Sequence, residues 1–405
     1  MWIRPGQLDL TYCTNVHAGE SWAEVAASIR QYAVPLQKRL AGVELFGVGL
    51  RLSAVAAAEL LRGTKLQDFQ RLLAEHQLYV AVINGFPYGS FHGTVVKSEV
   101  FAPDWRDAAR AKYTLDLAEI LSGLLPAGMD GGISTLPLSY KPWIHKDAGE
   151  YWPEIVTNLV DVVVQLLEIR KEKGSFIHLD IEPEPNGLVE NTSELIAFFE
   201  GPLDQMGAKM LASRLDVTCE VARQYLREHV QVCFDTCHLV VEFEDPVESL
   251  HALRDHRIGV GRIQISSALR VCFDGSQEVY ARCIDQLATF ADRTYLHQVI
   301  ERGRDGLLRR FVDLDDAVAV APSKESREWR IHFHMPLFTS RYNSLLSTQE
   351  DNLRVLAEVA GGSVSRHLEI ETYTWDVLPE ALRSDLLSSI EREYRWVLDA
   401  VCVRP

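Results

Sequence analysis

The sequence predicts an α/β fold, a single (β/α)8 TIM barrel with long loop insertions, and three observations support this prediction. Short apolar runs typical of strands alternate with helical segments, and this alternation predicts a parallel sheet that closes when eight units are present. Several helical segments begin at recognisable capping residues. Most of the apolar runs end in polar residues, at the position where a barrel carries its active site.

Nine segments have the composition of buried strands. They are residues 9–15, 43–51, 78–85, 131–138, 175–182, 230–236, 262–267, 330–337 and 367–374. Since a (β/α)8 barrel has eight strands, one of these segments belongs to an insertion. The 405 residues exceed the usual barrel length of about 250, so we expect one domain, 1–405, with insertions at about 86–112, 139–152 and 270–328.

Helix boundaries are predicted from capping residues. Three helix starts carry such a signal, which are Ser21 with Glu24, Asp245 with Pro246, and Ser347 with Glu350. A long helix from about 150 to 173 ends before Gly174, a residue type that favours the left-handed conformation of a helix terminus.

Charge and composition exclude several classes of protein. The formal net charge of −16 and the scattered basic residues argue against nucleic-acid binding, which needs clustered Lys and Arg. The sequence has no run of about 18 apolar residues and no run typical of a signal peptide, so we expect a cytoplasmic protein without a membrane span. The seven cysteines are interpreted as reduced, mostly core residues. A homo-oligomer is compatible with the sequence.

Carboxylates and imidazoles occur at the ends of several predicted strands. The polar residues at or just after these ends are Asn15, His17, Asn84, Glu182, Asp235, His238, Gln264, His332, His334, Glu369 and Glu371. Because the carboxyl ends of barrel strands meet at one face, these side chains are expected to lie close together. Their oxygen and nitrogen atoms are ligands that Mn²⁺, Mg²⁺, Co²⁺ or Zn²⁺ accepts, so a divalent metal cofactor is predicted.

The stretch VCFDTCHL carries the most specific local pattern. Asp235 ends an apolar strand, and His238 follows on the first turn after it. At this spacing the carboxylate can ligate a metal while the imidazole faces the same pocket as a ligand, a substrate contact or a proton carrier. In the alternative interpretation Asp235 only caps the following helix.

Four stretches at the strand ends carry a family resemblance. The stretches LDIEPEP, CFDTCHL, RIQISS and LEIETYTW, in this order, resemble the xylose-isomerase-like TIM-barrel superfamily of sugar isomerases, epimerases and endonuclease-IV-type enzymes. The resemblance implies that Glu182, Asp235 with His238, and Glu371 surround a metal. Gln264 stands where the superfamily has a histidine. If 330–337 rather than 262–267 is the seventh barrel strand, His334 replaces Gln264 in the metal shell.

Longer stretches resemble one bacterial family. LTYCTNVHAGESW, LYVAVINGFPYGSFHG, RIQISSAL, WRIHFHMPLF and IETYTWDVLP are similar to the EboE-type metabolite traffic proteins, over nearly the whole chain. This resemblance implies a small-molecule partner derived from a sugar or cyclitol, within secondary metabolism.

Three carboxylates, Asp180, Glu182 and Glu184, alternate along one side of the predicted strand at 175–182 and the loop after it. Glu182 is interpreted as a metal ligand and Asp180 as a group that orients it, and Glu184 is expected to leave the barrel on the loop that Pro183 and Pro185 stiffen. The alternative is a buried salt bridge at Asp180 with both glutamates solvated. On the last strand Glu371 is favoured as the ligand, with Glu369 in the layer beneath.

Other residues are candidates for contacting the substrate. His332 shares a strand face with His334 and is either part of a binding wall or an inward residue bonded to backbone. His92 lies among aromatic residues and glycines in the 86–112 loop, which suit a cover for a sugar ring. His17 and Asn84 follow the first and third predicted strands and complete the predicted substrate-binding set.

The predicted activity is metal-dependent isomerisation or epimerisation of a sugar- or cyclitol-derived metabolite. Glu182 and Glu371 would transfer a proton through a metal-stabilised enediolate, and His238 would assist catalysis. Two alternatives stay open. One is dehydration of the inosose type, and the other is a non-catalytic metabolite-binding protein whose metal site is degenerate at Gln264.

Overall fold

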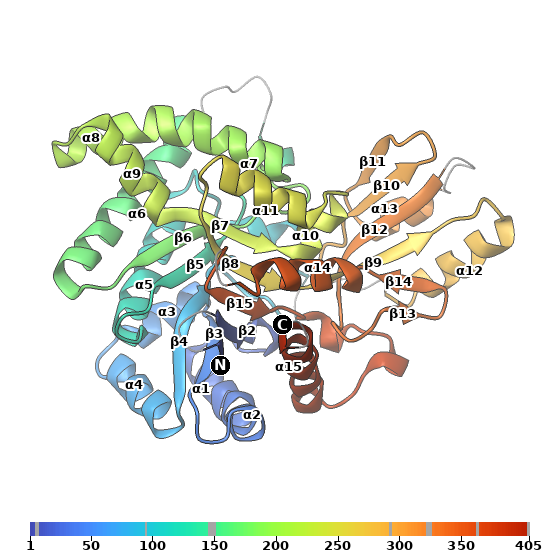
Figure 1. Ribbon diagram of the computed structural model, residues 1–405, viewed down its shortest axis with the longest axis horizontal. Coiled ribbons are helices and arrows are strands. Elements are labelled where there is room, and N and C mark those ends of the chain that lie inside the picture. The colour runs from blue at the N-terminus through green and yellow to red at the C-terminus, as the bar shows by residue number, and fades with distance from the viewer. Residues whose placement is uncertain are drawn as a thin grey trace.

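The computed structural model describes residues 1–4, 8–93, 95–144, 151–290, 294–320, 326–361 and 364–402, and it contains the predicted barrel (Figure 1). Its eight parallel strands are β2 (Leu8–Tyr12), β3 (Phe46–Arg51), β4 (Leu78–Asn84), β5 (Gly131–Thr135), β6 (Ile177–Ile181), β7 (Val230–Asp235), β8 (Val260–Ile265) and β15 (His367–Ile370). They are ordered β2-β15-β8-β7-β6-β5-β4-β3, and a bridge between Cys13 and Gly49 links the last strand to the first. A short strand, β1 (Trp2–Arg4), pairs antiparallel with β2.

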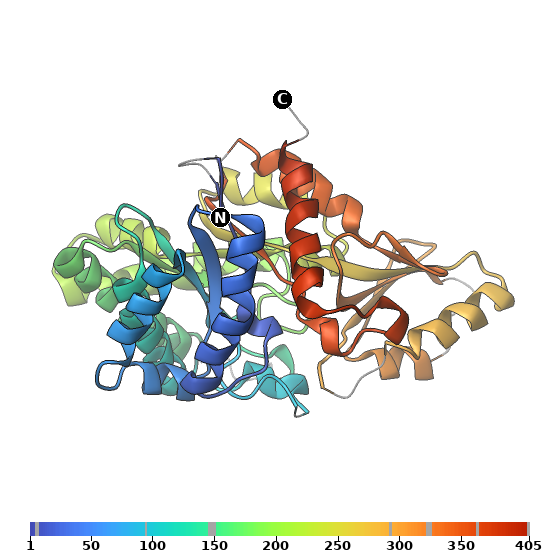
Figure 2. The same cartoon turned by 90° about the horizontal axis from the view of Figure 1, so that it is seen from below.

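Helices surround the barrel. They are α1 (Trp22–Ser28), α2 (Val34–Leu40), α3 (Ala54–Leu60), α4 (Lys65–Glu75), α5 (Ala108–Leu124), α6 (Tyr151–Lys173), α7 (Thr192–Phe198), α8 (Ala208–Leu215), α9 (Cys219–His229), α10 (Thr236–Val241), α11 (Pro246–Asp255), α14 (Gln349–Val359) and α15 (Leu386–Cys402). The C-terminal α15 packs against α2, so the two ends of the chain close the helical layer together (Figure 2).

A second sheet lies beside the barrel (Figure 1). Its antiparallel strands are β9 (Ser267–Cys272), β10 (Val299–Gly303), β11 (Leu308–Phe311), β12 (Ser326–Met335), β13 (Arg341–Tyr342) and β14 (Leu345–Ser347), accompanied by α12 (Gln277–Leu287) and α13 (Leu314–Ala319). All of them are inserted between the seventh and eighth barrel strands, β8 and β15. The ninth predicted strand, 330–337, is therefore β12 of this insertion, and 262–267 contains the seventh barrel strand.

The other two predicted insertions lie in barrel loops. The segment from 85 to 107 joins β4 to α5, and the segment from 136 to 150 joins β5 to α6. Residues 145–150 of the predicted insertion at 139–152 lie outside the described residues.

Capping residues explain most of the predicted helix starts. Ser21 and Glu24 form a reciprocal capping box at α1, and Asp245 accepts two backbone hydrogen bonds at α11. Gly174 follows α6 with a φ of +73°, as its residue type predicted. The capping box at Ser347 and Glu350 was wrong. Helix α14 begins after Thr348 without a side-chain cap, and the Ser347 hydroxyl, which donates to the carbonyl of Thr339, accepts from the Gln349 amide at 3.3 Å rather than from Glu350.

The barrel interior contains a fully buried charged layer. Arg262 donates to the Glu369 carboxylate at 2.8 Å and to two backbone carbonyls, and its Nε lies 3.8 Å from Asp180. Small residues leave room for this layer, since a Cβ atom on Gly49 would lie 1.8 Å from Glu369 Oε1. Asp180 thus forms a buried ion pair, as the alternative interpretation predicted. Glu369 lies in the layer beneath the strand ends.

Two further expectations concern the chain as a whole. Among the described residues, no helix combines the length and apolarity that crossing a membrane requires. The six cysteines whose side chains the structure describes are free, with Cys219 and Cys272 exposed and the other four buried, so the core interpretation holds for those four.

Candidate functional site

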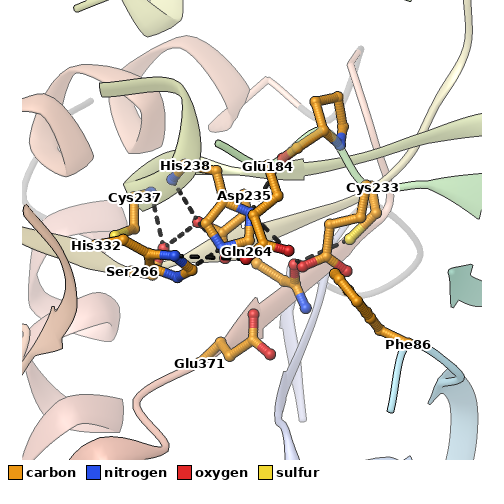
Figure 3. Close-up of polar contacts among 12 residues, drawn as sticks. Phe86, Glu184, Cys233, Asp235, Cys237, His238, Gln264, Ser266, His332 and Glu371 are labelled. Atoms are coloured by element: carbon orange, nitrogen blue, oxygen red, sulfur yellow. Dashed lines mark hydrogen bonds and ion pairs between the residues drawn. The ribbon is translucent and has the colours of Figure 1, made fainter. Parts of the chain in front are cut away.

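Three carboxylates meet at the C-terminal end of the barrel, as the strand ends predicted. Glu182 directly follows β6, Asp235 ends β7, and Glu371 directly follows β15. One oxygen of each lies within 4.8 Å of an oxygen of the other two, and all three side chains are buried. Figure 3 shows Asp235 with its hydrogen-bonding neighbours and Glu371 approaching them from a separate segment.

Each carboxylate keeps one buried oxygen without a hydrogen-bond partner. These atoms are Glu182 Oε2, Asp235 Oδ2 and Glu371 Oε2. The remaining oxygen of Glu371 accepts hydrogen bonds from Asn15 Nδ2 at 2.8 Å and Asn84 Nδ2 at 3.2 Å, which fixes its orientation. Buried acceptors of this kind are costly unless a proton or a cation satisfies them. The donor set fits a divalent cation.

The electrostatics separate Asp235 from the two glutamates. Burial and the neighbouring carboxylates raise the pKa values of Glu182 and Glu371 well above the usual range. Burial also acts to raise the pKa of Asp235, but the rings of His238 and His334 and its hydrogen bonds hold it below its usual value. Asp235 Oδ1 accepts from the His238 amide at 3.0 Å and the Ser266 hydroxyl at 2.7 Å. Asp235 is therefore both the cap of α10 and a member of the cluster.

His334 and Gln264 both approach this cluster, from different sheets. His334 lies on β12, and its Nδ1 contacts the carbonyl of Glu371 at 2.6 Å, so this nitrogen is the donor. The other nitrogen, Nε2, is buried without a partner, and His334 forms a ligand group with Asp235 and His238. Burial lowers the pKa of His334 to about 4, which keeps the ring neutral. Gln264 lies level with Asp235 on β8, but its oxygen accepts from the Cys233 thiol at 3.0 Å.

A chain of hydrogen bonds joins the barrel to the second sheet through two imidazoles. Gln298 Nε2 donates to Glu184 and to the Pro185 carbonyl, so its oxygen accepts from His332 Nδ1 at 2.7 Å. His332 Nε2 is therefore the acceptor in its 3.1 Å contact with His238 Nε2. His238 Nδ1 lies 3.1 Å from the Pro183 carbonyl. Both nitrogens of His238 face acceptors, an arrangement that favours the protonated ring. Burial acts in the opposite direction and lowers the pKa of His238.

Glu184 lies on the loop after β6, as predicted, but it is buried beside this chain of hydrogen bonds, so the alternative in which it is solvated is wrong. Only 5% of its surface is exposed, because the second sheet covers the loop after β6. Burial raises the pKa of Glu184 to about 8, against the hydrogen bond from Gln298. Near neutral pH its carboxyl group is therefore available as a hydrogen-bond donor.

A small pocket, with a cavity volume of about 60 Å³, opens above the carboxylates. Its inner end is polar and is lined by Glu182, Glu184, His238, His332, His334 and Glu371. Its outer wall is largely apolar and is lined by Phe86, Phe91, Val96, Val100, Tyr295 and Tyr373. Phe91, Tyr295 and Tyr373 pack together with ring centroids 5.0 to 5.4 Å apart, and they come from three separate loops.

The residues predicted to contact substrate do not all reach this pocket. Asn84 and His332 line it. His92 lies behind the aromatic wall, where its ring nitrogens contact the Asn15 carbonyl at 2.6 Å and the Tyr295 hydroxyl at 3.2 Å. His17 lies in a separate small hollow, stacked on Tyr32 with the ring centroids 4.2 Å apart. The 86–112 loop thus covers the pocket through Phe91, and His92 holds that loop in place.

Comparison with known proteins adds a likeness of fold. No family model and no curated protein matches the chain. Among solved structures, the IolI protein with a binding zinc atom is 12% identical, with 98% of this chain and 100% of that chain covered and a TM-score of 0.45. The probable 3-DHS dehydratase AsbF from Bacillus anthracis is 13% identical, with coverage of 96% and 98% and a TM-score of 0.44. A xylose isomerase domain protein from Alicyclobacillus acidocaldarius is 11% identical, with coverage of 97% and 99% and a TM-score of 0.45.

Four polar residues of the site were not among those predicted from the sequence. Asn15 was noted at a strand end without a role, and Glu184, Ser266 and Gln298 were not assigned to the site. The alternation of Asp180, Glu182 and Glu184 was a signal for Glu184, because all three were predicted to share one side of the chain. Gln298 carries no such signal, since its contacts with Glu184 and His332 depend on the packing of the second sheet.

Proposed function

We propose that the protein is a divalent-metal-dependent isomerase or epimerase of a small sugar- or cyclitol-derived metabolite. The observation that carries this proposal is the convergence of Glu182, Asp235 and Glu371 around unpaired buried oxygens. A pocket with a polar inner end opens directly above them. The resemblance of the sequence to EboE-type proteins supports a small metabolite of this class as the substrate.

Glu182, Asp235, Glu371 and His334 would hold the cation. The three carboxylates supply one unpaired oxygen each, and His334 supplies an unpaired Nε2 whose orientation is fixed by the Glu371 carbonyl. We assign this last position to His334 rather than Gln264, because the Gln264 oxygen is already bonded to Cys233. When bound, the cation would offset the negative charge that develops on the substrate oxygens during enolisation.

Glu182 and Glu371 are the proposed acid and base. Both line the pocket, and they follow strands that lie three places apart around the barrel. One would remove a proton from the carbon next to the substrate carbonyl, and the other would return it. Asn15 and Asn84 hold Glu371 in place through its other oxygen, so its free oxygen stays directed into the cluster.

The imidazoles and Glu184 would bind and polarise the substrate. His238 and His332 line the pocket and are bonded to each other, and Glu184 lies beside them. A donor at this position also suits protonation of a departing hydroxyl group. This arrangement makes dehydration of the inosose type the second candidate, and the two activities differ in whether water is lost from the product.

Turnover and solvent exchange test this proposal. Ketoses, inososes and their phosphates should be incubated in deuterium oxide with Mn²⁺, Mg²⁺, Co²⁺ or Zn²⁺ supplied in turn. We expect deuterium at the carbon next to the carbonyl, and loss of turnover in Glu182→Gln and in Glu371→Gln. Glu242→Gln is the matched control, because Glu242 is a buried glutamate paired with Arg310 outside the pocket.

Three results would contradict the proposal. Turnover without deuterium incorporation indicates hydride transfer or hydrolysis. Loss of water from the product selects the dehydratase. Absence of both turnover and bound metal at the three carboxylates favours a metabolite-binding protein of the traffic type.

A further inference from the structure

A second group of metal-ligating side chains lies at the opposite end of the barrel. Asp130 precedes β5, His178 is the second residue of β6, and His367 is the first residue of β15. These are the N-terminal ends of the strands, whereas the carboxylate cluster is at the C-terminal ends. One ligand atom from each of Asp130, His178 and His367 lies within 4.8 Å of the others.

Unpaired nitrogens point to a ligand between these residues. His178 and His367 are each 1% exposed, and the Nε2 atom of each is buried without a hydrogen-bond partner. Both Nε2 atoms face Asp130 Oδ2, at 3.7 Å from His178 and 3.5 Å from His367. These distances are too long for hydrogen bonds. They are close to the roughly 3.3 Å that separates two ligands of a tetrahedral Zn²⁺ ion with bonds of about 2.0 Å.

The surroundings of His178 are those of a metal-ligating histidine. Its Nδ1 lies 2.6 Å from Asp180 Oδ1, so the imidazole donates to a carboxylate on one side and directs Nε2 to the cluster on the other. Such a carboxylate fixes the tautomer of a ligating histidine and raises its basicity. Asp130 has the complementary property of access to solvent, with a side chain that is 33% exposed. Arg366 pairs with its other oxygen at 3.7 Å, leaving Oδ2 for the two imidazoles.

The charges at this end of the barrel also leave room for a cation. Among the residues that the structure describes, the carboxylates of Asp9, Asp130, Asp180 and Glu369 form ion pairs with two guanidinium groups, those of Arg262 and Arg366.

We propose that Asp130, His178 and His367 form a second, independent Zn²⁺ site that ties together strands from different sides of the barrel. Two imidazole nitrogens and one carboxylate oxygen match the preference of Zn²⁺ over Mg²⁺ or Ca²⁺. The fourth position faces solvent beside Asp130. The site stabilises the fold and is separate from the proposed reaction, since the Asp180, Arg262 and Glu369 layer lies between the two clusters.

Zinc binding by the full chain tests this site, with the carboxylate cluster disabled by Asp235→Asn. After removal of metal with a chelator, we expect Asp235→Asn to bind roughly one Zn²⁺ per chain and its Tm to rise by several degrees. X-ray absorption at the zinc edge should show two imidazole ligands. Adding Asp130→Asn should abolish both the binding and the rise in Tm, and because Asp130 is partly exposed the substitution leaves the buried core unchanged.

Two further variants keep the result interpretable. His367→Asn in the same background should also abolish zinc binding, whereas His229→Gln should not. His229 is an equally buried histidine of the same region, bonded through Nδ1 to the Ile177 carbonyl and outside the cluster. The proposal is overturned if Asp235→Asn binds no Zn²⁺, or if it retains its zinc after Asp130→Asn. Because the readout is zinc binding and Tm, failure of this site leaves the proposed enzymatic function untouched.

Discussion

The Nε2 atoms of His238 and His332 lie 3.1 Å apart, although 94 positions separate the two residues in the chain. His238 belongs to α10, directly after the barrel strand β7, and His332 belongs to β12 of the inserted sheet. The insertion is therefore part of the site, because it supplies His332, His334 and Gln298. A barrel without it would lose one side of the pocket.

Replacing His332 tests whether this contact serves catalysis. We expect His332→Phe to lower turnover about 100-fold or more, a typical effect of removing a group that takes part in proton transfer. Metal content should stay unchanged, since His334 rather than His332 is assigned to the cation. Kinetics and metal analysis of the same preparation check both expectations. His229→Phe is the control for loss of a buried imidazole, and equal turnover in the two variants would contradict the role of His332.

The buried pair between Arg262 and Glu369 is predicted to be essential for stability. Arg262→Met leaves the Glu369 carboxylate and two backbone carbonyls without their donor in a fully buried layer. We expect this variant to lower the free energy of unfolding, measured in urea, by about 3 to 5 kcal/mol. The exposed pair of Arg39 and Glu391 is the comparison, for which Arg39→Met should cost less than about 1 kcal/mol. Similar losses in the two variants would mean that the buried layer contributes little.

Glu393 gives the fold a pH dependence with a defined sign. Burial raises its pKa to about 8, against the hydrogen bonds from Thr372 and the Leu337 amide. The folded state therefore keeps a proton that the unfolded state releases above a pH of about 4.5. The stability contributed by this proton is complete below that pH and is lost as the pH rises through 8. The slope for one proton is at most about 1.4 kcal/mol per pH unit.

Comparison with Glu393→Gln isolates this contribution. The amide keeps an oxygen acceptor for Leu337 and Thr372 but does not titrate. We expect the free energy of unfolding to fall less between pH 5 and pH 9 in the variant than in the unaltered protein. Parallel pH profiles for the two proteins would show that Glu393 does not bind the extra proton.

The barrel could be predicted from the sequence because its determinants are local. Alternating strands and capped helices, with carboxylates at the strand ends, were sufficient to bring Glu182, Asp235 and Glu371 to one point. The choice between Gln264 and His334 as the ligand could not be made from the sequence, because both segments have the composition of a buried strand and either could be the seventh barrel strand. Both segments reach the site, since β8 is that strand and the inserted β12, which pairs with β9, brings His334 to the carbonyl of Glu371.

Burial was the property that the sequence predicted least well. Glu184 lies between Pro183 and Pro185 on the loop after β6, a position compatible with solvation, yet it is buried against Gln298 and His332 of the insertion. His17 lies close to a strand end, but the turn at Thr14–Val16 directs it to the outer side of the barrel, against Tyr32. In both cases the outcome depends on contacts between segments far apart in the chain.

Metal binding at the three carboxylates tests the central proposal most directly. In the Asp130→Asn background, which removes the second site, calorimetric titration of chelator-treated protein with Mn²⁺ or Zn²⁺ should give roughly one ion per chain. Asp235→Asn should abolish this binding, because it removes a ligand from the centre of the cluster. His238→Gln should retain it, because His238 is bonded to Pro183 and His332. Equal binding by all three proteins, or no binding by any of them, would contradict a metal centre formed by Glu182, Asp235 and Glu371.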